Sequence, residues 1–225
     1  MGHRREPLSE VYGPTSGGLK ATTRMLWRKS RQELYKALGE TAPKPPTTLD
    51  LLRLDADALS RFVFQRSTSK PTCAGPGCNG CCRGTVPVSV REAKDIAGAL
   101  TFEQGQAVRA ARMKPRTWIS RCPLLTTGGV CGIYDRRPVA CRLHHSIEDP
   151  ARCESPGPSE AMQIKVAQGG LLLALVAADG IGDLTPMLAA ELEAPGSGAE
   201  AFTRAHGEGL PDRIRPTGLM RTVCD

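Results

Sequence analysis

The chain has 225 residues, of which 40% are hydrophobic and only 4% aromatic, and it carries a formal net charge of +7. This length excludes a large multidomain assembly and allows one full domain with extensions or two small domains, of which one compact body is the simpler expectation. With so few aromatic rings, the core has to be built mainly from aliphatic side chains, and a bound metal would help to hold it together.

The positive charge lies in the first two thirds of the chain. Residues 1–70 carry 13 Lys and Arg against 7 Asp and Glu, residues 71–153 carry 12 against 6, and residues 154–225 carry 5 against 10. Because the basic residues are scattered among acidic ones, the pattern favours an ordinary solvated surface over a nucleic-acid interface, and it leaves a protein partner open.

The start of the chain shows no secretory signal, and its longest apolar stretch, residues 171–178, is too short to cross a bilayer. We therefore expect a cytoplasmic protein with no membrane partner. In a reducing compartment, clustered cysteines favour metal or redox chemistry over disulfides, and the odd total of nine cysteines also argues against complete pairing.

The N-terminal part predicts a tail followed by helices. Residues 1–22 are rich in Gly, Pro, Ser and Thr and show no apolar period, which is typical of a poorly ordered tail. Residues 25–38 have the pattern of an amphipathic helix that ends at Gly39. The prolines in residues 42–46 indicate a stiff linker, and residues 49–64 predict further helix. The basic face of the first helix consists of Arg24, Arg28, Lys29, Arg31 and Lys36.

The middle of the chain predicts a short strand and two helices. Residues 85–90 alternate as in an edge strand, since Pro87 cannot donate a hydrogen bond to a sheet. Ser89-Val-Arg-Glu and Thr101-Phe-Glu-Gln have the spacing of capping boxes. They predict one helix through about Ala99 and a second that ends before Pro115.

A hairpin and a short helix are expected next. Residues 122–134 have short apolar arms around Thr-Thr-Gly-Gly, the pattern of a tight hairpin that would bring Cys122 and Cys131 near each other. Residues 135–138 have the pattern of a helix start with proline in the first turn, which places Cys141 about one turn later.

The C-terminal part predicts helix over residues 159–193 with a break near residues 180–182, after which Gly, Pro and charged residues return. We expect a mostly α-helical fold with a small β-hairpin, in which helices flank an irregular, cysteine-rich metal-binding core. The predicted parts are a disordered tail (1–22), an N-terminal helical segment (23–70), a cysteine-cluster metal-binding domain (71–153) and a C-terminal helical, acidic extension (154–225).

Seven of the nine cysteines are candidate metal ligands. They are Cys73, Cys78, Cys81, Cys82, Cys122, Cys131 and Cys141. Several thiolates on a glycine-rich loop are typical of zinc and iron–sulfur sites. Seven candidates exceed the four ligands of one tetrahedral zinc or one [4Fe-4S] cluster, so either two centres exist or some of the thiols have other roles.

The cysteine pattern resembles a known family. Cys78-x2-Cys81-Cys82, Cys122-Pro-x-Leu and Cys131-x-Ile-Tyr-x-x-Arg-Pro-x-x-Cys141-Arg are similar to the bacterial YkgJ-type cysteine cluster proteins, the CxxCxxCC proteins described as zinc- or iron-chelating and often labelled iron–sulfur proteins. The resemblance spans roughly residues 73–145.

The resemblance implies ligand roles for six of these cysteines. Cys73 stands apart, because four residues separate it from Cys78 where the family commonly has two, so it binds differently or not at all. The matching residues Tyr134, Arg137, Pro138 and Arg142 are expected to orient the second cysteine group, with the arginines offering charge and hydrogen bonds near the thiolates.

These patterns predict a protein that holds an iron–sulfur cluster, most simply [4Fe-4S], or zinc. A structural zinc protein with a protein or nucleic-acid partner is one alternative. A cluster-dependent enzyme is another, since the flagellin lysine methylases share a similar cysteine pattern, but the chain has no Gly-x-Gly-x-x-Gly loop and misses the radical S-adenosylmethionine spacing at Cys73 by one residue.

Other cysteines and histidines are weaker candidates. His144 and His145 follow Cys141 closely enough to join a mixed site or to assist a reactive thiol, although a surface or hydrogen-bonded role is commoner. Cys153 and Cys224 have the surroundings of isolated thiols.

Overall fold

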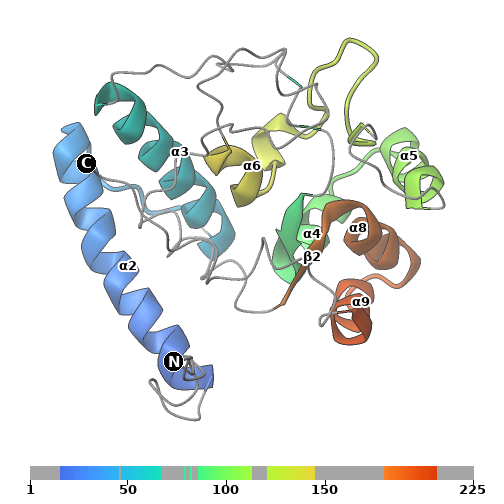
Figure 1. Cartoon of the computed structure of the whole chain (residues 1–225), viewed down its shortest axis with the longest axis horizontal. Helices are drawn as coiled ribbons and strands as arrows, with labels where there is room; N and C mark the ends of the chain where they lie inside the picture. The colour runs from blue at the N-terminus through green and yellow to red at the C-terminus, as the bar shows by residue number, and fades with distance from the viewer. Residues whose placement is uncertain are drawn as a thin grey trace, which may run out of the picture.

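The computed structural model describes residues 16–45, 47–66, 79, 82, 86–112, 121–144 and 180–206. Over these residues the protein is mostly helical and has one small two-stranded antiparallel sheet, which confirms the predicted fold class. Helices α2 (Ser16–Leu38) and α3 (Thr48–Arg66) lie side by side at one end of the molecule. The sheet lies at the other end with helices α4 (Val90–Ala97), α5 (Phe102–Arg112), α8 (Leu184–Glu193) and α9 (Gly198–His206) (Figure 1).

Helix α2 is longer than the sequence pattern predicts. It begins at Ser16, well before Met25, so residues 16–22 of the predicted tail are helical. Leu19, Lys20 and Ala21 in this added stretch favour helix, although Gly17 and Gly18 beside them do not. The helix ends where expected, because Gly39 has a φ of 71°, a left-handed conformation that glycine adopts without strain.

A buried carboxylate joins α2 to α3. Asp55 on α3 is 0% exposed and accepts hydrogen bonds from Trp27 Nε1 at 3.0 Å, Arg31 Nε at 2.8 Å and the Tyr35 hydroxyl at 3.1 Å. Burial raises the pKa of Asp55, while the hydrogen bond and charge of Arg31 oppose that shift. Arg31, predicted on the basic face of α2, therefore points into the interface between the two helices.

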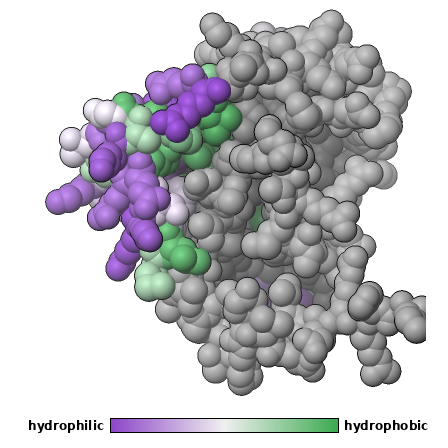
Figure 2. All heavy atoms as spheres, turned by 60° about the vertical axis from the view of Figure 1, so that its left-hand side comes forward, coloured by the Kyte–Doolittle hydropathy of each residue, from purple (hydrophilic) through white to green (hydrophobic). Residues whose placement is uncertain are grey.

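The outward side of α2 mixes basic and apolar residues. Arg28, Lys29 and Lys36 are exposed, and so are Met25 (64%) and Leu26 (44%). Among the described residues that Figure 2 displays on this side of the molecule, hydrophilic ones predominate and hydrophobic patches are smaller. No helix in the described ranges is long and apolar enough to span a membrane.

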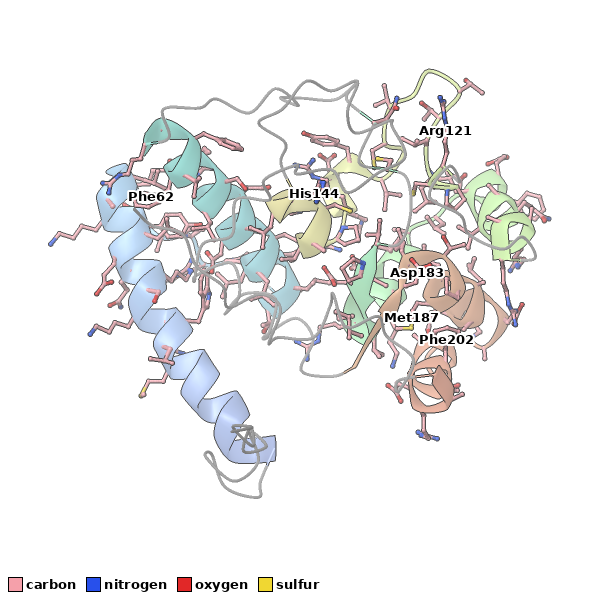
Figure 3. The ribbon with its side chains drawn as sticks, in the orientation of Figure 1. Phe62, Arg121, His144, Asp183, Met187 and Phe202 are labelled. Carbon is pink, nitrogen blue, oxygen red and sulfur yellow. The ribbon has the colours of Figure 1, made fainter. Side chains whose placement is uncertain are left out.

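The sheet joins two distant parts of the chain. Strand β1 (Pro87–Ser89) pairs antiparallel with β2 (Ile181–Asp183), with Val88 opposite Gly182. The predicted strand is thus confirmed over three residues. Gly182 lies against α8 and α9, since an ideal Cβ there would be 2.8 Å from Met187 Sδ and 3.4 Å from Phe202 Cε1 (Figure 3).

The main apolar core lies between four helices: α4 (Val90–Ala97), α5 (Phe102–Arg112), α8 (Leu184–Glu193) and α9 (Gly198–His206). Both predicted capping boxes are present at the starts of α4 and α5, where Ser89 and Thr101 exchange hydrogen bonds with the residues three positions later. The largest buried side chains of this core are Val88, Ile96, Val108, Leu184, Met187 and Leu188.

The C-terminal residues contribute more to this core than the sequence indicates. Helices α8 and α9 fall in the predicted extension, yet they pack on α4, and Ala199 of α9 is fully buried. The buried carboxylate of Glu191 accepts hydrogen bonds from the N–H groups of Gly196 and Ala199, which turns the chain from α8 into α9. Residues 1–15, the predicted helical residues 159–179 and residues 207–225 lie outside the described ranges.

Two glycines offer a test of this packing. An ideal Cβ on Gly198 would overlap the backbone oxygen of Ala190, whereas one on Gly105, within α5, would meet Arg109 and Leu192 at an ordinary 3.8 Å. We expect Gly198→Ala to lower the free energy of unfolding by about 2 kcal/mol. We expect Gly105→Ala to raise it by roughly 0.5–1 kcal/mol. Urea denaturation followed by circular dichroism measures both, and equal effects of the two changes would contradict the α8–α9 packing.

Candidate metal centre

Four of the seven predicted ligands lie in the described part of the chain. Cys82, Cys122, Cys131 and Cys141 are all half-buried. Each comes from a different local structure: a short turn, the two arms of a hairpin, and helix α6 (Val139–Leu143). The other three predicted ligands, Cys73, Cys78 and Cys81, lie outside the described ranges. The same holds for the weaker candidates His145, Cys153 and Cys224.

The two cysteine groups are joined through their backbones. The N–H of Cys122 donates to the carbonyl oxygen of Cys82 at 2.7 Å. The N–H of Cys82 in turn donates to the carbonyl oxygen of Asn79 at 3.0 Å, which closes a tight turn. The end of the first cysteine group therefore lies directly against the start of the second.

The predicted hairpin brings the arms of the second group together. Cys131 forms a β-bridge with Leu125, and the N–H of Leu125 donates to the carbonyl oxygen of Cys122 at 3.2 Å. Thr126 N–H also donates to the Val130 carbonyl at 2.9 Å. The chain reverses as the Thr-Thr-Gly-Gly pattern predicts, although a single bridge takes the place of two paired strands.

A side chain that the motif leaves unspecified connects the two groups as well. Asn79, between the positions of Cys78 and Cys81, donates from Nδ2 to the carbonyl oxygen of Gly129 at 3.0 Å. Sequence reasoning did not select Asn79. Its position inside the cysteine motif was the only sequence signal for a role in the site. That role depends on a partner, Gly129, that lies on a distant part of the chain.

Cys141 is held by a helix that is anchored to the main core. The N–H of Val139, at the start of α6, donates to the buried carboxylate of Glu92 at 2.7 Å. Cys141, Cys122 and Ile133 all pack against the main apolar core. The helix starts later than predicted: residues Tyr134–Arg136 form a separate 3-10 turn, and Pro138 precedes α6 as its N-cap instead of lying in its first turn. Cys141 therefore lies in the first turn of α6.

The residues between Cys131 and Cys141 are fixed by an arginine network. Arg142 is 6% exposed and donates to the carbonyl oxygens of Asp135 at 2.5 Å and Arg137 at 3.1 Å, while Asp57 on α3 accepts a further hydrogen bond at 2.5 Å. The guanidinium of Arg137 lies 4.1 Å from the centre of the Tyr134 ring. Arg142 thus orients this segment by binding its backbone, and its charge is matched by Asp57.

Comparison with known proteins finds a family to which this part of the sequence is similar. A family model matches residues 72–162, and its description is "CxxCxxCC: Putative zinc- or iron-chelating domain". Residues 72–162 are thus similar to this domain, and we call them the CxxCxxCC domain below. The match covers both cysteine groups and confirms the resemblance seen in the sequence. We found no curated protein and no solved structure that matches the chain.

His144 is a half-buried residue at the end of α6 in the CxxCxxCC domain (Figure 3). Burial lowers the pKa of its imidazole, which favours the neutral form. Arg121, in contrast, is exposed beside Cys122 at the opposite end of the second cysteine group (Figure 3). The half-buried position of His144 is compatible with the sequence-based hypothesis of a mixed Cys/His site, whose second histidine, His145, lies outside the described ranges.

The donor set of the CxxCxxCC domain fits a soft metal. Half-buried thiols lie beside apolar residues such as Leu124 and Ile133, a setting that limits access of water to bound zinc or to an iron–sulfur cluster. Within the ranges that the structure describes, no three His, Cys, Asp or Glu residues are grouped so that they could hold a metal ion.

Proposed function

We propose that the CxxCxxCC domain binds one iron–sulfur cluster that takes thiolates from both cysteine groups, residues 73–82 and 122–141. The observation that carries this proposal is the 2.7 Å hydrogen bond between the Cys122 N–H and the Cys82 carbonyl oxygen. It supports a shared site because it joins the backbones of the two groups at Cys82 and Cys122. Bound there, a cluster would supply one-electron transfer or redox sensing.

The protein's own residues would orient and shield the thiolates. Cys122 and Cys141 rest on the main apolar core, and Arg142 holds the backbone between Cys131 and Cys141. The formal net charge of +7 would offset the negative charge of a thiolate-bound cluster. A cytoplasmic location suits this role, since a reducing compartment keeps thiols available for metal.

A structural zinc ion is the second candidate. Four thiolates satisfy tetrahedral zinc as well as they satisfy a [4Fe-4S] cluster. The favouring observation is that the described core is divided into one main apolar cluster and two smaller ones, to which a metal crosslink would add stability. In that case a protein partner would have to be sought through the flanking segments.

Anaerobic purification tests the choice of metal. Metal analysis, an acid-labile sulfide assay and a visible absorption spectrum would be measured on the same sample. Iron with stoichiometric sulfide and broad visible absorption would support the cluster, whereas stoichiometric zinc without colour would support the structural site. A purified protein with neither metal would contradict both candidates.

Serine substitutions test whether the site is shared. We expect Cys82→Ser and Cys131→Ser each to remove essentially all bound metal and to lower the melting temperature, because metal binding is coupled to folding. Cys224→Ser, far outside the cysteine groups, is the control and should change neither. Two separate centres would instead lose only half of the metal in each variant.

A further inference from the structure

We infer that Asn79 is a positioning residue of the metal centre, whose side-chain amide docks the first cysteine group on the hairpin that carries the second. This inference rests on the proposed function, because the centre it serves is the shared one. It assigns a role to a residue that the cysteine motif leaves unspecified.

The contact between Asn79 and Gly129 is close on both sides. Asn79 Nδ2 donates to the Gly129 carbonyl oxygen at 3.0 Å. The same nitrogen is 2.6 Å from the point where a Cβ on residue 129 would lie. Real Cβ atoms do not approach a nitrogen so closely, so the contact requires glycine at this position.

The turn at Gly129 is itself well defined. Gly129 has a φ of 74°, and its N–H donates to the Thr126 carbonyl oxygen at 2.9 Å. The Thr126 hydroxyl accepts a hydrogen bond from the Val130 N–H at 3.2 Å. These bonds fix the direction of the Gly129 carbonyl, which is two residues before Cys131.

Two attachments therefore hold Asn79 and Cys82, the described residues of the first cysteine group. The amide of Asn79 binds the tip of the hairpin near Cys131, and the carbonyl of Cys82 binds the arm that begins at Cys122. The turn closed by the 3.0 Å hydrogen bond from the Cys82 N–H to the Asn79 carbonyl oxygen connects the two attachments. Removing one of them leaves this turn able to swing about the other, so the ligands would need to be ordered when metal binds.

Supporting residues around metal ligands commonly change metal affinity by 10- to 100-fold. We expect Asn79→Ala to release its metal about tenfold faster than wild type to a chelator, at the lower end of that range. Asn79→Asp keeps the shape of the side chain but replaces the donating amide with a carboxylate that faces a carbonyl oxygen. It should release metal at least as fast as Asn79→Ala, which separates hydrogen bonding from packing.

A glycine pair supplies the matched control. Gly129→Ala introduces both a side chain at positive φ and the clash with Asn79, whereas Gly39→Ala, at a φ of 71°, introduces only the former because nothing lies within 4 Å of its ideal Cβ. We expect Gly129→Ala to release metal about tenfold faster than wild type. Gly39→Ala should lower the melting temperature but release metal at the wild-type rate.

The experiment uses the full chain purified with its native metal under anaerobic conditions, and it follows release of that metal to EDTA alongside thermal unfolding. Fast release from Asn79→Ala, Asn79→Asp and Gly129→Ala, with wild-type release from Gly39→Ala, would support the inference. Wild-type release from both Asn79 variants, or equal release from the two glycine variants, would overturn it while leaving the proposed function intact. Wild-type protein that holds neither iron nor zinc would overturn the proposed function, and the inference with it.

Discussion

Replacing Asp55 with Ala is expected to lower the free energy of unfolding by about 3–5 kcal/mol. The carboxylate is fully buried and receives hydrogen bonds from Trp27, Arg31 and Tyr35. Its removal leaves two buried donors, on Trp27 and Tyr35, and the half-buried guanidinium cation of Arg31 without this acceptor. Because this network joins α2 to α3, the loss should appear as a lower midpoint in urea, followed by circular dichroism.

Glu33→Ala is the control for this experiment. Glu33 also lies on α2, is acidic and is exposed, so its replacement should change the unfolding free energy by no more than about 0.5 kcal/mol. Trp27→Phe removes one donor and keeps most of the ring, and it should cost about 1 kcal/mol. A loss below about 1 kcal/mol for Asp55→Ala would contradict a stabilising role of the network.

Replacing Glu92 with Ala is expected to lower the unfolding free energy by about 3 kcal/mol and to accelerate metal release. Glu92 is fully buried, and its carboxylate accepts hydrogen bonds from the backbone N–H and hydroxyl of Ser89, both at 3.0 Å, and from the Val139 N–H at 2.7 Å. One side chain thus caps α4 and also holds the start of the helix that carries Cys141.

Glu92→Gln separates the two roles of this carboxylate. It keeps one carbonyl oxygen and nearly the same volume, so it should retain part of the lost stability, while Glu103→Ala on the exposed start of α5 should have little effect. Urea denaturation measures stability, and transfer of metal to EDTA measures release. Wild-type release from Glu92→Ala would show that α6 does not depend on this anchor to hold Cys141.

Features that depend on neighbouring residues could be predicted. The capping boxes at Ser89 and Thr101 and the end of α2 at Gly39 require only hydrogen bonds or backbone angles within a few positions of each other. The reversal of the chain between Cys122 and Cys131 follows in the same way from its turn residues. Four of the seven predicted ligands lie in described, half-buried local structures, and their role as metal ligands stays a prediction.

Pairings between distant parts of the chain could not be predicted. The partner of β1 is β2, more than ninety residues later, and neither strand has a pattern long enough to select the other. The sequence pattern places Arg31 on the exposed basic face of α2. In the structure it points inward instead, because it donates a hydrogen bond to the buried carboxylate of Asp55 on α3. Helix α9 follows a stretch of Gly, Pro and Ser, and the buried Glu191 caps its start.

The chemistry of the candidate centre was determined by the sequence alone, because thiolates select soft metals whatever fold presents them and because the cysteine spacing defines the CxxCxxCC domain. Only the tertiary structure decided how the cysteine groups meet. The hydrogen bonds from Cys122 to Cys82 and from Asn79 to Gly129 join residues that are forty or more positions apart. Such contacts form only when packing of the core compensates for the entropy lost on closing the long loops between them. No local sequence pattern specifies which distant residues will meet.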